Sequence, residues 1–203
     1  MKKYAVLHEP GDIVTLAGTR FVVLDVERRG SLPDSLFLLA LESVGASEFG
    51  SSNNYAESDL KKAVDKWLED MGKRGLDNAK LIPREIDLTT LDGSGCYGKL
   101  SVKAAPLTLD EAREYADIIP NAERWCWLAT GWSGPSKSDG DLALYVYSNG
   151  GWYNFNCSNS VGIRPALKIP SDLLLDSADK PDLSEVPTDT LLEEIRRRVV
   201  DKA

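Results

Sequence analysis

Hydrophobic and polar positions alternate most regularly along residues 142–157, which predicts a β-hairpin. Aliphatic residues occupy every second position from Leu142 to Val146, the period of a strand with one buried and one exposed face. Asn149-Gly150-Gly151 can adopt the positive φ angles of a tight turn, and an aromatic-rich run from Trp152 to Cys157 follows directly. We therefore expect two antiparallel strands joined by a short turn.

Shorter apolar runs predict a sheet around this hairpin. Residues 13–16 and 21–26 flank a glycine-containing turn and predict a first hairpin, and the unbroken run 36–41 predicts a buried strand joined to it. Residues 125–128, Trp-Cys-Trp-Leu, predict a core strand in which both tryptophans fill space. The Ser- and Asn-rich residues 45–55 predict a loop.

Two segments show the spacing of helices. Ser58 can cap a helix that begins at Asp59, in which apolar residues recur every three or four positions up to Met71. Thr108 and Glu111 have the spacing of a capping box, and we expect this second helix to continue as far as Pro120. Strands combined with two flanking helices predict an α+β fold.

The chain changes character after Pro170, and this change suggests a domain boundary. We expect a folded domain over residues 1–170, an acidic linker or extended strap over 171–187, and an amphipathic helix over 188–203. About two heptads cannot sustain a coiled coil alone. The final helix is therefore expected to dock on its own domain or on a neighbouring subunit of a homo-oligomer.

Charge and hydropathy disfavour several classes of protein. The 203-residue chain has a formal net charge of −8, and its Lys and Arg residues do not cluster before residues 196–198, which disfavours binding to nucleic acid. No apolar run approaches the roughly 20 residues that cross a bilayer, so we expect no membrane insertion. The N-terminus lacks the pattern of a signal peptide, so we expect synthesis in the cytoplasm, and display on a virion or cell surface only by another route.

Residues suited to catalysis are few. His8 is the only histidine, and we expect it at the surface or at a strand end rather than in a Ser-His-Asp triad. Phosphate-loop, HExxH and CxxC motifs are absent. Asp139 and Asp141 fall short of the roughly six to eight oxygens that calcium takes, and we expect them to be solvated. We therefore expect a non-enzymatic protein without a metal or cofactor.

The three cysteines are Cys96, Cys126 and Cys157, and their odd number favours a reducing compartment. A buried free thiol is the expected state of each. A disulfide between Cys126 and Cys157 stays open as an alternative.

The composition of the 142–157 hairpin and the residues after it predicts a ligand-binding surface. Rigid aromatic side chains stand beside adaptable hydrogen-bonding groups, a mixture that binding paratopes use. We expect Tyr145 and Tyr147 to face outward on the first strand, and the face of Asn154 and Asn156 to be exposed on the second, because buried asparagines need partners. The candidate ligand-binding residues are Tyr145, Tyr147, Asn149, Trp152, Tyr153, Asn154, Asn156, Ser158 and Asn159.

Several segments together resemble a domain family of bacterial and phage proteins. That family is similar to a branch of the C-type lectin-like fold, in the version shared with formylglycine-generating enzymes and with the variable proteins of diversity-generating retroelements. One departure is Cys126-Trp127-Leu128-Ala129, where relatives commonly have paired tryptophans followed by Leu-Arg. The resemblance covers about residues 10–169 and rests on residues 11–14, 21–25, the helix around Trp67-Leu68, residues 107–112, Trp127-Leu128 and Gly162-Ile163-Arg164-Pro165-Ala166-Leu167.

The resemblance implies a C-type lectin-like fold of mixed and antiparallel sheets with two flanking helices. It also implies a protein or glycan ligand, bound by side chains that a retroelement rewrites just before the closing Gly162–Leu167 segment. Two alternatives come with it: a structural or receptor-binding subunit of a phage particle or surface assembly, and an oxidase that binds copper through Cys126 and Cys157. Calcium-dependent sugar binding is not implied, because the sequence has no EPN, QPD or WND signature.

Arg164 lies among apolar residues, so we expect it to be partly buried. A buried guanidinium needs carboxylate or carbonyl partners. We expect Arg164 to tie the end of the last strand to the body of the domain.

Overall fold

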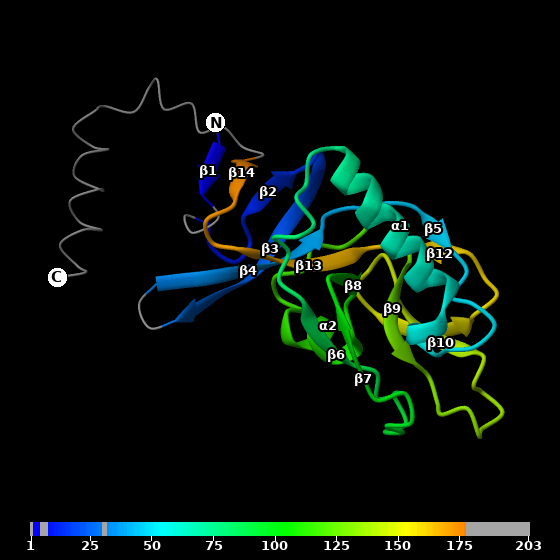
Figure 1. The fold of residues 1–203 in the computed structure, drawn as a ribbon. Helices are drawn as coiled ribbons and strands as arrows, with labels where there is room; N and C mark the ends of the chain where they lie inside the picture. Colours follow the sequence, from blue (N-terminus) through cyan, green and yellow to red (C-terminus); the bar gives the residue numbers. More distant parts are fainter. Residues whose placement is uncertain (1, 5–7, 30–31, 178–203) are drawn as a thin grey trace, which may run out of the picture.

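A seven-stranded antiparallel sheet is the largest element of the protein. The computed structural model describes residues 2–4, 8–29 and 32–177, and in it the strands follow the spatial order β1-β14-β2-β3-β4-β13-β8 (Figure 1). Their bounds are β1 Lys2–Tyr4, β2 Ile13–Leu16, β3 Thr19–Arg29, β4 Leu32–Ala40, β8 Ala104–Pro106, β13 Pro165–Pro170 and β14 Leu174–Ser177.

A five-stranded sheet carries the hairpin, in the spatial order β11-β10-β9-β12-β5. All its pairs are antiparallel except β12 with β9, which is parallel. The bounds are β5 Ala46–Ser47, β9 Cys126–Gly131, β10 Leu142–Val146, β11 Trp152–Asn156 and β12 Val161–Gly162, and a separate pair is formed by β6 Arg84–Asp87 and β7 Lys99–Val102.

Two α-helices accompany the sheets within the described residues, so the expected α+β class with mostly antiparallel sheets is confirmed. Helix α1, Asp59–Lys73, begins where Ser58 accepts a hydrogen bond from the backbone N–H of Lys61. Helix α2, Leu109–Glu114, has the expected capping box of Thr108 and Glu111. It ends well before Pro120, so its expected length was wrong. A short 3₁₀ helix, η2 (Tyr55–Glu57), precedes α1.

The first hairpin is confirmed, and its turn explains the sequence between the strands. Ala17 and Gly18 both have positive φ, 47° and 77°, as a two-residue turn between antiparallel strands requires. Strand β3 then pairs along β4, the strand expected from the apolar run 36–41. Leu36 and Leu38 pack into one hydrophobic cluster while Phe37 and Leu39 pack into the other, which is why this run is apolar at every position.

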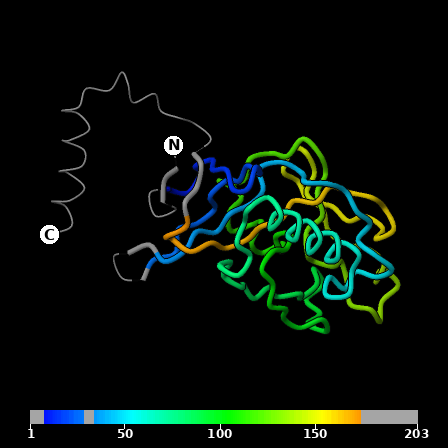
Figure 2. Tube along the Cα trace, turned by 45° about the horizontal axis from the view of Figure 1, so that its top comes forward, coloured from blue at the N-terminus to red at the C-terminus, as the bar shows by residue number. Residues whose placement is uncertain are grey.

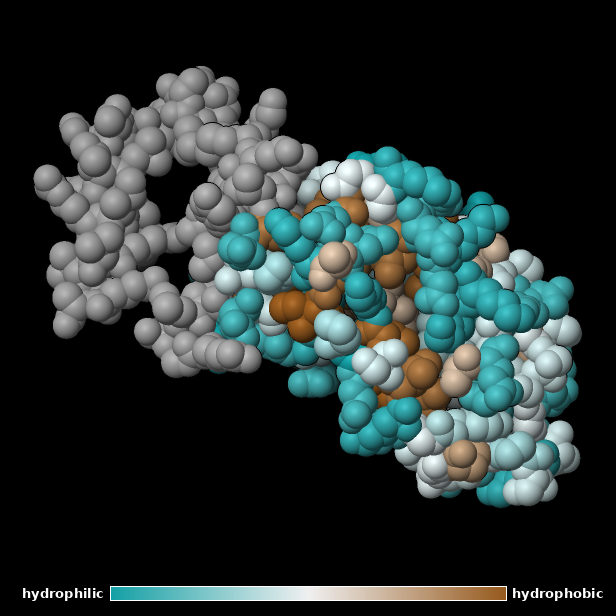
Figure 3. Space-filling model, in the orientation of Figure 1, coloured by the Kyte–Doolittle hydropathy of each residue, from teal (hydrophilic) through white to brown (hydrophobic). Residues whose placement is uncertain are grey.

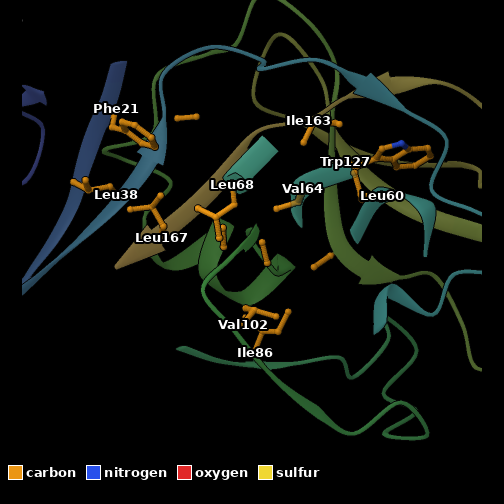
Figure 4. Packing of buried hydrophobic residues seen from close by; sticks show 14 of the residues in the cluster. Phe21, Leu38, Leu60, Val64, Leu68, Ile86, Val102, Trp127, Ile163 and Leu167 are labelled. Atoms are coloured by element: carbon orange, nitrogen blue, oxygen red, sulfur yellow. The ribbon is translucent and has the colours of Figure 1, made fainter. Parts of the chain in front are cut away.

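The larger hydrophobic core lies between the two sheets and α1. Leu60, Val64 and Leu68 of α1 point into it, and Trp127 of β9 closes its far end (Figure 4). A second cluster lies on the opposite face of the large sheet, where α2 packs against β9. Strand β9 is buried at every residue and contributes to both clusters.

The large sheet continues past Pro170, which corrects the expected domain boundary. Strand β14 lies between β1 and β2 and pairs with both, so the two ends of the described chain lie side by side (Figure 2). Part of the expected acidic linker is therefore a strand of the sheet. The rest of that segment and the expected helix over 188–203 lie outside the described residues.

Two smaller expectations also differ from the structure. The segment 45–55 contains the short strand β5, because Ala46 and Ser47 pair with Gly162 and Val161. His8 is buried rather than at the surface, and its Nδ1 lies 3.2 Å from Oδ2 of Asp12. Among the described residues, no helix combines the length and the hydropathy that crossing a membrane requires.

Candidate ligand-binding face

The expected hairpin is confirmed as β10 and β11, which lie at the edge of the five-stranded sheet. Tyr145 pairs with Tyr153, Leu144 with Asn154 and Val146 with Trp152. The turn uses Gly150 at φ +84°, and Asn149 accepts a hydrogen bond from the backbone N–H of Gly151 at 3.0 Å. The turn residues that the sequence singled out therefore have the expected local role.

Strand pairing decides which residues share a face, and it corrects the sequence interpretation. Residues directly opposite each other in an antiparallel pair point to the same side. Tyr145 therefore shares its face with Tyr153, and Asn154 and Asn156 point to the other side with Leu144. The expected exposed surface combined Tyr145 and Tyr147 with the asparagines, so it mixed the two faces.

Five aromatic side chains form a continuous cluster on one face, here called the aromatic face: Trp125, Tyr145, Tyr147, Tyr153 and Phe155. The Trp125 ring lies 4.7 Å from that of Tyr147 and 5.4 Å from that of Tyr145, between centroids. The ring of Tyr153 lies 5.9 Å from that of Tyr147. Such contacts fix the rings relative to one another before any ligand arrives.

The aromatic face is buried at its centre and open at its border. Tyr145 is only 7% exposed and Tyr147 and Phe155 are partly buried, whereas Trp125 is 38% and Tyr153 54% exposed. The expected outward exposure of Tyr145 was therefore wrong, because Trp125 stacks over it. Burial also raises the pKa of the Tyr145 hydroxyl, with a smaller contribution from the neighbouring tyrosines.

A groove of about 360 Å³ adjoins the aromatic face. Trp125 and Phe155 belong to both, and the groove adds one acid, Glu123, and one base, Arg124. Over the five-stranded sheet, the surface at the right-hand end of Figure 3 is largely pale, the colour of residues of intermediate hydropathy. The remaining lining residues of the groove are Ala46, Ser160, Val161 and Gly162.

Most polar residues of the expected site are occupied by their own turn. Asn156 donates to Asp141 at 2.6 Å, and its side-chain oxygen accepts from the N–H and the hydroxyl of Ser158. Asn159 donates to the backbone oxygen of Asn156 at 3.0 Å. These hydrogen bonds shape the loop that follows β11. Ser160 of this loop lines the groove, whereas Asn156, Ser158 and Asn159 do not.

Trp152 points away from the aromatic face, although it is a neighbour of Tyr153 in sequence. It is 44% exposed, and the Arg113 guanidinium of α2 lies 4.6 Å from its ring centroid. On this face Val146 and Leu144 pack with Leu128 and residues of α2 in the second hydrophobic cluster. The structure thus separates two sets of residues that the sequence analysis had combined.

The closing Gly162–Leu167 segment is held tightly in the centre of the fold. A Cβ atom at Gly162 would lie 2.6 Å from the backbone oxygen of Trp125 and 3.0 Å from Sγ of Cys126, so only glycine fits where β12 meets β9. Arg164 is 6% exposed, and its Nε donates to the backbone oxygen of Ala40 at 2.7 Å. The expected burial of Arg164 and its carbonyl partner are confirmed.

All three cysteines are free, so the open alternative of a disulfide between Cys126 and Cys157 does not occur in this structure. Cys126 pairs with Val146 at one end of β10, and Cys157 donates its N–H to Asp141 at the other end. About five strand residues separate these positions, roughly 15 Å. Burial raises the pKa of Cys126 to about 11 and that of Cys157, also beside Asp141, to about 12. The two thiols therefore do not form a shared copper site.

The described residues also contain no cluster of three or more His, Cys, Asp or Glu side chains that could hold a metal ion.

Sequence reasoning missed Trp125 and Phe155 as members of the site. Trp125 lies just before β9 and was interpreted as a core residue together with Trp127, but only Trp127 is fully buried, at 1% exposed. Alternation across Cys126 already places the two tryptophans on positions of the same parity. Phe155 could have been found by pairing it with Ala143 beside Tyr145. Trp125 could not have been found in this way, because its contact with Tyr145 and Tyr147 of the hairpin depends on the path of the chain just before β9 begins.

Comparison of the chain with protein-family models, curated proteins and solved structures gave no match in any of the three.

Proposed function

We propose that this protein is a non-enzymatic ligand-binding module that uses the aromatic face. The observation that carries the proposal is a cluster of five aromatic rings in mutual contact, of which Trp125 and Tyr153 are exposed and Trp125 also lines the groove. Exposed aromatic rings supply large contact areas at little cost in conformational entropy. Contiguous exposed aromatic surface on a protein of this net charge marks an interaction site rather than a solubility feature.

The ligand class that this surface fits is a glycan or a protein segment. Exposed rings stack on the apolar face of a sugar or pack against side chains, and Glu123 and Arg124 place hydrogen-bonding groups of both signs in the adjoining groove. A site with a few polar groups beside a largely apolar wall is the usual form of a specific binding pocket.

The test is binding of the purified protein to a panel of bacterial-surface glycans and proteins. The double variant Trp125→Ala/Tyr153→Ala is expected to lose binding at least tenfold, because it removes both exposed rings. Trp152→Ala is the matched control, since it truncates an equally exposed aromatic residue of the same strand on the opposite face. Equal loss in both variants, or unchanged binding in the double variant, would rule out the aromatic face.

We also propose that the domain is a branch of the C-type lectin-like fold. The support is an α+β architecture with two helices, a hairpin at the edge of a small sheet, and a closing Gly162–Leu167 segment that runs from the small sheet into the large one. An experimental structure would test this proposal by superposition on C-type lectin-like domains, and a different strand connectivity would refute it.

A further inference from the structure

Strand β11 is an outer strand of the five-stranded sheet, and in the described part of the chain no strand pairs with its outer edge. The ladder with β10 shows which backbone groups point to that edge. At the tip of the hairpin the Tyr147 N–H donates to the Gly151 oxygen, so the odd-numbered residues of the two strands bond to each other. The even-numbered residues Trp152 and Asn154 therefore direct their N–H and C=O groups away from the sheet.

The free part of this edge is short and well defined. Asn156 also points outward, but its oxygen already accepts the backbone N–H and the side-chain Nδ2 of Asn159, both at 3.0 Å. Within the described chain, no printed hydrogen bond uses the outward groups of Trp152 and Asn154. Unpaired N–H and C=O groups in a row are a template on which another strand can add.

Strand β11 also lacks the features that keep sheet edges from pairing, which are charges, proline, bulges or a very short strand. Its sequence Trp-Tyr-Asn-Phe-Asn has no charge and no proline, and its register with β10 is unbroken. The other outer strands of the two large sheets each have such a feature: β1 contains Lys2 and Lys3, β8 has three residues and ends at Pro106, and β5 has two residues. Strand β11 therefore has the sequence of a strand that pairs.

The exposed side chains of β11 favour a partner at the edge over a ligand on one face. Trp152 and Tyr153 are 44% and 54% exposed, more than the other large hydrophobic side chains of the described residues. They point to opposite faces of the hairpin. A ligand on the aromatic face covers only Tyr153, whereas an added strand contacts both faces because its own side chains alternate.

We propose that β11 pairs with β11 of a second copy of the chain, antiparallel and around a twofold axis at Tyr153, so that the two five-stranded sheets become one. In this register Trp152 lies opposite Asn154 of the second copy, and each donates its free N–H to the free C=O of the other. Tyr153 lies opposite Tyr153 of the second copy, which joins the two aromatic faces. Because both copies use the same edge, the contact closes on itself as a dimer.

The charges at the two ends of β11 favour the antiparallel direction. The Arg113 guanidinium lies 4.6 Å from the Trp152 ring centroid at one end. It also contacts Asp110 at 3.4 Å, but its side chain is 46% exposed and stays accessible. At the other end, the Asp141 carboxylate accepts a hydrogen bond from the Asn156 side chain at 2.6 Å. An antiparallel pair brings the Arg113 end of each copy to the Asp141 end of the other, which selects this orientation even though exposed ion pairs contribute little energy.

The experiment is sedimentation analysis of the purified protein at concentrations up to about 100 μM. We expect the mass of two chains. Asn154→Pro removes an outward N–H that β10 does not use, so it is expected to weaken dimerisation at least tenfold while the hairpin stays folded. Asn154→Ala keeps the N–H and is the matched control, which is expected to dimerise like the unaltered protein.

Two outcomes of this experiment would overturn the proposal. The mass of a single chain at about 100 μM would leave the edge to a strand of another protein. Unweakened dimerisation of Asn154→Pro would place the contact between copies elsewhere on the chain.

Charged variants at the axis test the register independently. Tyr153 is 54% exposed, so Tyr153→Lys and Tyr153→Glu are expected to keep the native circular dichroism spectrum. Each variant alone places like charges opposite each other and is expected to dimerise at least tenfold more weakly than the unaltered protein. An equimolar mixture of the two is expected to dimerise more strongly than either alone. Equal dimerisation of the mixture and the single variants would overturn the pairing around Tyr153.

Dimerisation through β11 and ligand binding by the aromatic face can fail separately. Trp125 belongs to the aromatic face and lies before β9, so Trp125→Ala is expected to weaken ligand binding and to leave the dimer unchanged. Asn154→Pro is expected to weaken the dimer and to leave the residues of the groove unchanged. Loss of the dimer in folded Trp125→Ala would place the contact on the aromatic face and not at the edge.

Discussion

The two faces of the β10–β11 hairpin share one backbone but differ in what their side chains contact. On the aromatic face, five rings contact one another in stacked, tilted and edge-to-face arrangements, and Trp125 and Tyr153 are the most exposed of them. On the other face, Leu144 and Val146 pack against the second hydrophobic cluster. Because side chains alternate along a strand, one hairpin can present exposed aromatic rings on one side and pack against a core on the other. The comparison teaches that the residue types in a segment say less about a surface than their positions along the strand, because only every second residue lies on the same face.

Truncating the buried face is expected to have the largest effect on stability. Leu144 is 1% exposed, so Leu144→Ala leaves a cavity and is expected to lower the free energy of unfolding by about 3 kcal/mol. Tyr153→Ala, in the adjacent residue pair and on the aromatic face, is expected to change it by about 1 kcal/mol or less. Urea denaturation monitored by circular dichroism measures both. Equal losses would show that the two faces are equally buried in solution, contrary to this comparison.

Variants of Arg164 test how much this buried residue contributes to the stability of the fold. Arg164→Ala removes the hydrogen bond to the Ala40 carbonyl and empties part of a buried site, so we expect a loss of about 2 kcal/mol and a clearly lower melting temperature. Arg164→Met is expected to lose less, because it fills a similar space and removes a buried guanidinium whose Nη2 has no hydrogen-bond partner. Thermal denaturation of both variants checks the order. An unchanged melting temperature for Arg164→Ala would contradict the structural role of this residue.

The buried Cys126 thiol is expected to make the free energy of unfolding depend on pH in the alkaline range. Its folded-state pKa of about 11 lies above that of an unfolded thiol, about 8.5, because burial disfavours the thiolate. Its contribution is therefore complete below about pH 8.5 and is lost as the pH rises toward 11, since the unfolded chain releases the proton first. The slope reaches at most about 1.4 kcal/mol per pH unit.

Urea denaturation between pH 8 and pH 11 measures this slope for the unaltered protein and for each variant, and the slopes are then compared. Cys126→Ala is expected to flatten it, and Cys96→Ala is the matched control because Cys96 is exposed. A flattening of the same size in the control would assign the pH dependence to other groups.

The contact between Arg113 and Trp152 is expected to have the smallest effect. Both side chains are partly exposed, so Arg113→Ala is expected to cost about 0.5 kcal/mol. The same change should shift the fluorescence of Trp152 to longer wavelength, because its ring gains contact with water. The difference spectrum between Arg113→Ala and Arg113→Ala/Trp152→Phe isolates that residue. An unshifted spectrum would indicate that the guanidinium does not cover the ring in solution.

Local sequence signals were sufficient for the elements that depend on neighbouring residues. Ser58 and Thr108 mark helix starts through hydrogen bonds to backbone groups three residues away, and Ala17-Gly18 and Gly150 provide turn conformations. These contacts require no distant partner. The length of α2 was overestimated because no local signal in the sequence marks its end after Glu114.

Elements that depend on distant partners could not be predicted in the same way. Strand β14 lies in a segment with the composition of a linker, and it is a strand because β1 and β2 leave a place between them. His8 is buried although the acidic, Pro- and Gly-containing residues 9–12 follow it directly, since its environment comes from the fold around it. Pairing across β10 and β11 could have corrected the face assignment, but only once the register was known.

By itself, the sequence determined the α+β class, the starts of the two described helices with their caps, and the two hairpins. The tertiary structure decided which residues of that segment meet. It placed Trp125 over Tyr145, separated Cys126 from Cys157, and left the buried Nη2 of Arg164 without a hydrogen-bond partner. The physical reason is range: caps, turns and periodicity act over a few residues, whereas stacking, ion pairing and cavities depend on side chains that only the complete chain packing brings together.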